Sequence, residues 1–152
     1  MKKKKEENNL EYRIKRIHSL KFYFKEIESN RLNSMFEKTD ALYLNTKTIL
    51  NIDDKESSIS IDINTELLER KSNEILVEHS GRTVYQIKGL KDIYNETDNV
   101  YDIPNEFLIQ LYSLAYSHTR ALLATEVSPT VYKDKYFLPI INPQDFLKNK
   151  NS

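Results

Sequence analysis

The side chains that most often carry out chemistry in proteins are few and widely spaced in this sequence. Cysteine is absent, which excludes a thiol nucleophile, a disulfide framework and a cysteine-based zinc site. The three histidines, His18, His79 and His118, lie far apart and lack the spacing of metal ligands. A histidine in such a position is more often a hydrogen-bonded structural residue than a ligand or a base. We therefore expect no metal site.

Phosphate-binding and nucleophile motifs are missing as well. The chain has only two glycines, Gly81 and Gly89, whereas a dinucleotide-binding fingerprint or a P-loop needs several. Ser80 precedes Gly81, but no Gly-x-Ser-x-Gly elbow surrounds any serine. The carboxylates fall on polar strand positions and in loops. We expect neither an enzyme nor a cofactor, and an enzymatic function is the last of our alternatives.

Length and composition indicate one globular domain. The 152 residues fit a single domain, and 39% hydrophobic residues are enough for a packed core. The net charge is zero, from 23 basic and 23 acidic residues, which argues against a dedicated nucleic-acid binder. No apolar run approaches the ~20 residues of a membrane span, and Glu6 and Glu7 stand where a signal peptide needs apolar residues. We expect a cytoplasmic protein without membrane insertion.

Charge is unevenly distributed along the chain. We expect a basic disordered tail at residues 1–9, a single domain at residues 10–147 and a second disordered tail at residues 148–152. Residues 51–80 contain eight acidic side chains against three basic ones. Two interpretations of these acids remain open, a solvated face or an acidic surface that docks a basic partner. The candidate docking residues are Asp53, Asp54 and Glu56.

Alternating apolar residues predict β-strands in the first half of the chain. Residues 10–28 alternate with one break in phase, which indicates a bulge near His18. Residues 29–41 contain several Asn and Ser and predict a connection, with Met35 packed against the core. Residues 42–50 form either a second strand or an extended crossover.

The clearest strand lies near the middle of the sequence. Ile59, Ile61 and Ile63 alternate with polar residues, which predicts one buried face and one solvated face. A break follows at residues 79–81, whose glycine supplies turn freedom. Gly89 falls inside the continuing strand pattern and marks a bulge or a close backbone approach.

After the strands, the hydrophobic period becomes helical. The helix begins near Pro104 and continues to about Glu126, and Ser128 and Pro129 end it. Its apolar stripe is wide, which predicts packing both on its own sheet and on a neighbouring subunit. The candidate interface residues are Leu108, Leu111, Tyr112, Ala115, Tyr116 and Arg120. An extended segment follows, so the element order predicts an α+β fold with one antiparallel sheet and one helix layer.

Three segments match, in the same order, short motifs of one known protein family. Residues 12–22 look like that family's opening I-x-R-I-Y segment, and residues 111–121 look like its helix ending in Y-A-R-E. Residues 136–146 look like its F-P-x-L-x-L-x-P-V-N-F tail, with Phe146 on the final phenylalanine. In these three segments the chain resembles the SecB family of export chaperones.

This resemblance implies a fold, an assembly and a function. The implied fold is a four-stranded antiparallel sheet packed with one long helix and followed by an extended C-terminal segment. The implied homo-oligomer is a dimer of dimers that holds unfolded polypeptides (preproteins) in apolar grooves without ATP and passes them to the SecA motor. Apolar groove residues and ordinary core residues look alike in sequence. The candidate client-binding residues are Leu42, Tyr43, Leu44, Tyr132, Tyr136 and Phe137.

The chain also departs from the family pattern. Its net charge is zero, whereas SecB chaperones are typically acidic. We expect no second C-terminal helix and no SecA-binding tail after Leu147. These departures make an antitoxin, within a toxin–antitoxin–chaperone system, an alternative client. A non-chaperone scaffold or ligand-binding module on the same fold is the alternative from another class, because a fold does not determine a function.

Overall fold

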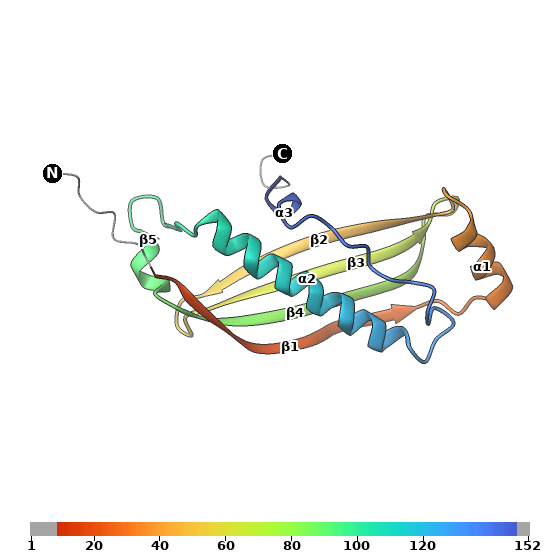
Figure 1. The fold of residues 1–152 in the computed structure, drawn as a ribbon, viewed down its shortest axis with the longest axis horizontal. Coiled ribbons are helices and arrows are strands. Elements are labelled where there is room, and N and C mark those ends of the chain that lie inside the picture. Colours follow the sequence, from red (N-terminus) through yellow and green to blue (C-terminus); the bar gives the residue numbers. More distant parts are fainter. Residues whose placement is uncertain (1–8, 149–152) are drawn as a thin grey trace.

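A computed structural model describes residues 9–148, which fold around one four-stranded antiparallel sheet (Figure 1). The strand order is β1-β4-β3-β2, so β1 and β2 are the two edges. Helix α2 crosses one face of this sheet and contacts β4, β3 and β1. The main elements are β1 (Glu11–Phe24), β2 (Leu42–Asp53), β3 (Ser58–Glu69), β4 (Glu74–Lys88) and α2 (Asn105–Val127). The predicted α+β fold is confirmed.

Shorter elements join these five. They are α1 (Ser29–Glu37), η1 (Leu90–Ile93), β5 (Tyr94–Asn95), β6 (Val100–Tyr101) and α3 (Asp145–Lys148). The tails that we expected at the two ends fall mainly on residues 1–8 and 149–152, outside the described residues. Within residues 9–148, no helix is long and apolar enough to cross a membrane.

The central strand β3 has one buried face and one partly buried face. Ile59, Ile61 and Ile63 point toward α2 and are fully buried, as their alternation predicts. The opposite face was expected to be solvated, but Asp62 is only 6% exposed. Its two carboxylate oxygens accept hydrogen bonds from the Arg82 guanidinium on β4, at 2.7 and 2.8 Å. A paired carboxylate can be buried at a central strand position because the bidentate partner compensates its lost hydration.

Strand β1 is bent by two irregularities in its pairing with β4. The register shifts between Ile14 and Arg16 and again between Ser19 and Lys21. The second shift lies next to His18, where the break in alternation predicted a bulge. Each bulge adds a residue to one strand and increases the local twist. The edge strand β1 is therefore curved, and the C-terminal half of α2 passes over it (Figure 1).

Residues 29–41 contain a helix that the sequence did not indicate. We expected a connection there, because Asn and Ser favour turns, but helix α1 spans Ser29–Glu37. Its buried residues are Leu32 and Met35, three positions apart on one face. Burial of this face against the core outweighs the weak helix propensity of its polar residues. The expected burial of Met35 is confirmed.

The turn expected at Gly81 is absent, whereas the close backbone approach expected as one possibility at Gly89 is present, since a Cβ there would lie 3.3 Å from the Asn9 carbonyl oxygen. Strand β4 runs without interruption through residues 79–81, so Gly81 makes no turn. A Cβ at Gly81 would lie 2.6 Å from the Oγ1 of Thr119, so this glycine permits the close approach of α2. Gly89 follows β4 with a φ of +88°, and so it supplies the turn. Left-handed backbone is accessible to glycine at little cost.

Candidate functional site

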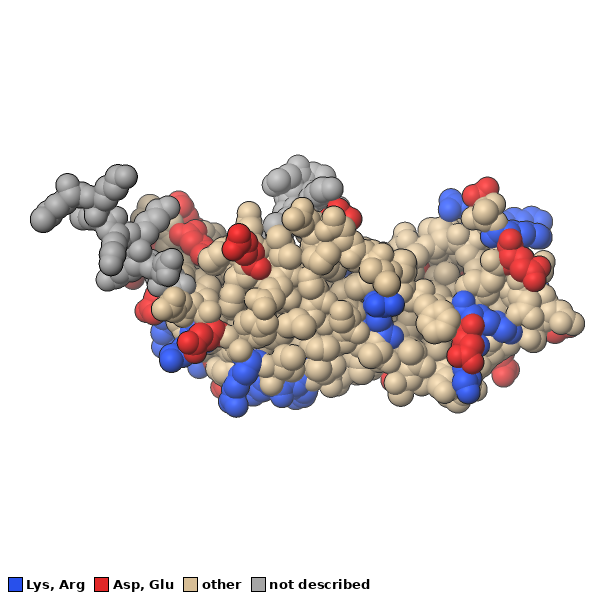
Figure 2. All heavy atoms as spheres, viewed as in Figure 1, with Lys and Arg blue, Asp and Glu red and all other residues tan. Residues whose placement is uncertain are grey.

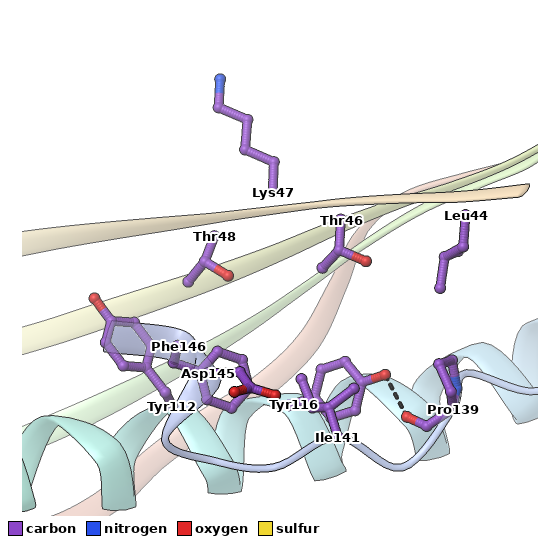
Figure 3. A pocket seen from close by; sticks show the side chains of 10 residues that line it. All are labelled: Leu44, Thr46, Lys47, Thr48, Tyr112, Tyr116, Pro139, Ile141, Asp145 and Phe146. Carbon is purple, nitrogen blue, oxygen red and sulfur yellow. Dashed lines mark hydrogen bonds between the residues drawn. The ribbon is translucent and has the colours of Figure 1, made fainter. Parts of the chain in front are cut away.

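A groove lies between edge strand β2 and helix α2, with the C-terminal segment over it (Figure 3). Its volume is about 440 Å³. The lining comes from three parts of the chain that are far apart in sequence. The lining residues are Leu44, Thr46, Lys47, Thr48, Tyr112, Tyr116, Pro139, Ile141, Asp145 and Phe146.

Two tyrosine rings of α2 form one side of the groove, and the Phe146 ring of the C-terminal segment lies against both. The Phe146 ring lies almost parallel to that of Tyr112, with centroids 5.5 Å apart and 24° between the planes. It also meets Tyr116, at 5.9 Å and 63°. Tyr112 and Tyr116 project from consecutive turns of α2, because residues four apart share one helix face. The groove therefore presents a preformed aromatic surface to an apolar ligand.

Strand β2 forms the other side. Leu44, Thr46 and Thr48 alternate along the strand and point toward α2, while Lys47 points away (Figure 3). In the described structure β2 pairs with β3 alone. An edge strand presents backbone N–H and C=O groups that can pair with an added extended chain. Side-chain and backbone recognition are thus available at the same place.

Two hydrogen bonds attach the start of the C-terminal segment to α2. The Tyr116 hydroxyl donates to the Pro139 carbonyl oxygen at 2.5 Å, and the Arg120 Nε donates to the Leu138 carbonyl oxygen at 3.1 Å. Leu138 itself is buried. Residue 138 is therefore anchored, and the segment continues from there along the groove.

The two tyrosines of the groove are uncharged, and Asp145 brings one carboxylate to the lining beside them. Burial raises the pKa of the Tyr112 phenol, and burial also raises that of Tyr116, against the opposing charge of Arg120. Both phenols are consequently neutral at physiological pH. Figure 2 shows that charged side chains gather toward the two ends of this face and are sparse over its middle. The groove is suited to binding apolar and aromatic groups.

The histidines lie apart from the groove. The Nε2 of His79 is 2.8 Å from the Ser19 Oγ, and the Nδ1 of His118 is 2.9 Å from the Thr83 Oγ1. Burial lowers the pKa of both imidazoles. Within residues 9–148, no group of three or more His, Asp or Glu side chains is placed to hold a metal ion.

Three of the predicted client-binding residues lie on β2, but only Leu44 lines the groove. Tyr43 lies on the other face of the sheet, where its hydroxyl donates to Asn73 at 2.9 Å. The Arg70 guanidinium lies 5.0 Å from the centre of the same ring. Leu42 is half-buried and packs against the core. Alternation along a strand separates Tyr43 from its two neighbours.

The other three predicted client-binding residues belong to the segment after α2. Tyr132 and Tyr136 are buried in the core, and the Tyr132 hydroxyl donates to the Lys25 carbonyl oxygen at 2.8 Å. Phe137 is 61% exposed and does not line the groove. For the two tyrosines, ordinary core packing is the observed environment. The groove contacts of this part of the chain come from later residues.

The predicted interface residues of the helix are mostly buried within the chain. Leu108, Leu111, Ala115, Tyr112 and Tyr116 all lie in the core cluster. The wide apolar stripe is covered on one side by the sheet and on another by the C-terminal segment. The C-terminal segment of the same chain covers part of the stripe that was expected to face a neighbouring subunit, and the subunit contact itself stays a prediction. Arg120, likewise, makes its carbonyl contact within the chain.

The predicted acidic docking residues lie in the turn between β2 and β3. The Asp53 Oδ1 accepts hydrogen bonds from the backbone N–H groups of Lys55 and Glu56, at 3.0 and 3.1 Å. Glu56 also lies 3.8 Å from the Lys15 ammonium. Asp53 therefore shapes the turn, and the acidic character of this face is reduced by adjacent cations.

Sequence reasoning missed most of the groove. It placed Tyr112 and Tyr116 at a subunit contact, and it assigned none of Thr46, Thr48 and Phe146 to a binding groove. The alternation Leu44-Thr46-Thr48 was an available signal, since it places three residues on one strand face. Their proximity to Phe146 depends on the path of the C-terminal segment, for which no periodic signal exists.

The fold and the groove define an α+β protein with a SecB-like fold. No protein-family model and no curated protein sequence matches the chain. Among solved structures, it is similar to the SecB-like chaperone Rv1957 of Mycobacterium tuberculosis, in complex with a ChAD peptide from the Rv1956 HigA1 antitoxin. The TM-score is 0.52 at 12% identity, over 86% of this chain and 88% of that one. A protein of unknown function from Streptococcus agalactiae aligns with a TM-score of 0.44 at 11% identity, over 86% and 98%.

Proposed function

We propose that this protein is an ATP-independent chaperone that holds unfolded polypeptide in the groove between β2 and α2. The observation that carries the proposal is an aromatic groove that runs beside β2, an edge strand of the sheet within residues 9–148. An unfolded chain offers both apolar side chains and free backbone groups, and this site accepts both kinds. Binding of this kind needs no nucleophile, metal or nucleotide.

Two classes of client are compatible with this site. A peptide from an antitoxin is supported by the SecB-like neighbour, which was solved with one. Exported preproteins, delivered to the SecA motor in the cytoplasm, are supported by the motif resemblance in residues 12–22 and 136–146. A scaffold or small-ligand module is the alternative from another class. It predicts a single folded partner and no binding of unrelated unfolded chains.

We also propose that the protein acts as a homo-oligomer. Strand β1 is an edge strand and carries the exposed apolar side chains Ile14, Ile17, Leu20 and Tyr23. Apolar side chains on an unpaired edge favour association with another chain. A second copy of this chain is the simplest partner. Association into a dimer or a dimer of dimers would cover the exposed apolar side chains of β1.

A pair of single substitutions tests the groove. Thr46 points into the groove and Asn45 lies on the opposite face, and both are exposed on the same strand. Thr46→Asp and Asn45→Asp therefore add the same charge at adjacent positions. We expect Thr46→Asp to weaken binding of a permanently unfolded, reduced protein by about tenfold, because a carboxylate is costly beside an apolar ligand. Equal binding of the unfolded protein by the two variants would show that it does not bind in the groove.

A further inference from the structure

The groove is already partly filled by the chain itself. Residues 139–146 line it together with β2 and α2. The Phe146 ring lies against both groove tyrosines, Tyr112 and Tyr116. An aromatic side chain of the protein thus occupies the position that suits an apolar side chain of a ligand.

The segment is attached in an uneven way. Its start is anchored by the buried Leu138 and by hydrogen bonds to the carbonyl oxygens of Leu138 and Pro139. Farther along, backbone hydrogen bonds run within the segment, from Asp145 N to Asn142 O at 2.9 Å and from Phe146 N to Pro143 O at 3.2 Å. Local bonds of this kind persist when a segment moves as a unit.

The segment is only partly incorporated into the core, because Ile141 and Phe146 pack against it while remaining half-buried. Ile140 is 84% exposed, although it lies between two residues that line the groove. The segment adds no strand to β2, because β2 pairs only with β3 in the described structure. The edge of β2 therefore remains free while the aromatic position is filled.

We propose that residues 139–146 are an internal ligand of the groove, which shields it reversibly until a client replaces the Phe146 ring. The identity of the client rests on the proposed function, whereas the shielding of the groove by residues 139–146 does not depend on that function. If the groove is open for only a fraction of the time, the apparent affinity for a client is reduced by that fraction. A client must then bind the groove strongly enough to displace Phe146, which favours clients whose own aromatic residue binds there tightly.

Three full-length variants test the shielding. Phe146→Ala removes the ring from the groove. Tyr116→Phe removes only the hydroxyl that holds Pro139, and leaves the groove wall intact. Phe137→Ala is the control, because it removes an exposed ring of the same segment outside the groove. The probes are an anionic apolar dye, anilinonaphthalene sulfonate, and a permanently unfolded, reduced protein, with circular dichroism confirming the fold.

We expect Phe146→Ala and Tyr116→Phe to increase dye fluorescence and to bind the unfolded protein about threefold to tenfold more tightly, the factor expected for loss of a competing aromatic contact. Phe137→Ala should match the wild type. Dye binding that increases in Phe146→Ala alone would show a fixed wall with a new cavity, which overturns the inference. Unchanged dye binding in both variants also overturns it. Increased dye binding in both, with no binding of the unfolded protein by any form, supports the shielding and overturns the proposed function.

Discussion

Gly81 on β4 lies directly beneath Thr119 on α2. A Cβ at Gly81 would lie 2.6 Å from the Thr119 Oγ1 and 3.2 Å from the Leu122 Cδ1. The helix can therefore approach the sheet only because position 81 has no side chain. The same approach sets the position of the α2 turns that carry Tyr112 and Tyr116, and hence the groove.

Gly81→Ala is expected to destabilise the fold. The added methyl group overpacks the contact between sheet and helix, at a cost of about 1–3 kcal/mol. The measurement is the free energy of unfolding from urea denaturation. Combining it with Thr119→Ala should recover part of that loss, since it removes the nearest atom. Additive effects of the two substitutions would contradict the proposed contact.

Stability is expected to depend on pH through His79. This imidazole is fully buried, and burial lowers its pKa from the ordinary 6.5, against the opposing charge of Glu126. The unfolded chain then binds a proton at a higher pH than the folded chain, so stability rises with pH across this window. The contribution of His79 to the free energy of unfolding is complete above pH 6.5, and it is lost as the pH falls through the pKa that His79 has in the folded chain.

Urea midpoints between about pH 5 and pH 7.5 measure this effect, since histidines titrate there and carboxylates titrate lower. His79→Gln should flatten part of the pH dependence. Burial lowers the pKa of His118 as well, so the double variant with His118→Gln should flatten it further. An unchanged slope in the double variant would rule out both histidines as the cause.

If SecA is a partner, the turn between β2 and β3 is a candidate contact. Replacing Asp53, Asp54 and Glu56 by Ser should weaken SecA binding and leave binding of unfolded chains intact. The turn should persist, because a serine hydroxyl can accept the backbone hydrogen bonds that Asp53 accepts. Binding measured at two salt concentrations reports the electrostatic part.

A matched control exists in the hairpin of β5 and β6. Replacing Glu96 and Asp98 in its turn, and Asp102 directly after β6, by Ser makes the same change in net charge at another exposed site. SecA binding should survive in this control. Equal loss of binding in both triple variants would indicate a nonspecific charge effect, and loss of client binding as well would argue against a separate docking face.

The sheet and the long helix could be predicted from the sequence because each has a strong local period. Ile59, Ile61 and Ile63 alternate, and the apolar residues from Leu108 onward follow a helical spacing. Helix α1 was not predictable, because its polar composition favours a turn and only burial of Leu32 and Met35 makes it a helix. Tertiary packing outweighs local preference in that case.

The groove was beyond prediction for a related reason. Its two sides and its cover come from β2, α2 and the segment after Leu138, and no local pattern shows that they meet. Both glycines had an identified need for special geometry. The assignment of a turn to Gly81 was wrong, whereas the close backbone approach expected as one of two possibilities at Gly89 is present, since a Cβ there would lie 3.3 Å from the Asn9 carbonyl oxygen. A glycine in a strand pattern indicates that a side chain cannot be accommodated at that position. The sequence does not show whether a positive φ or a closely packed helix is the reason.

We propose that this protein holds unfolded polypeptides. The most direct measurement is the refolding of a slow-folding, unrelated protein with and without this chain, with the solution mass recorded by light scattering in the same buffer. We predict arrest of refolding at near-stoichiometric ratios, by a dimer or a tetramer. An unchanged refolding rate in the presence of a stable, folded oligomer would contradict the account and would favour one dedicated folded partner.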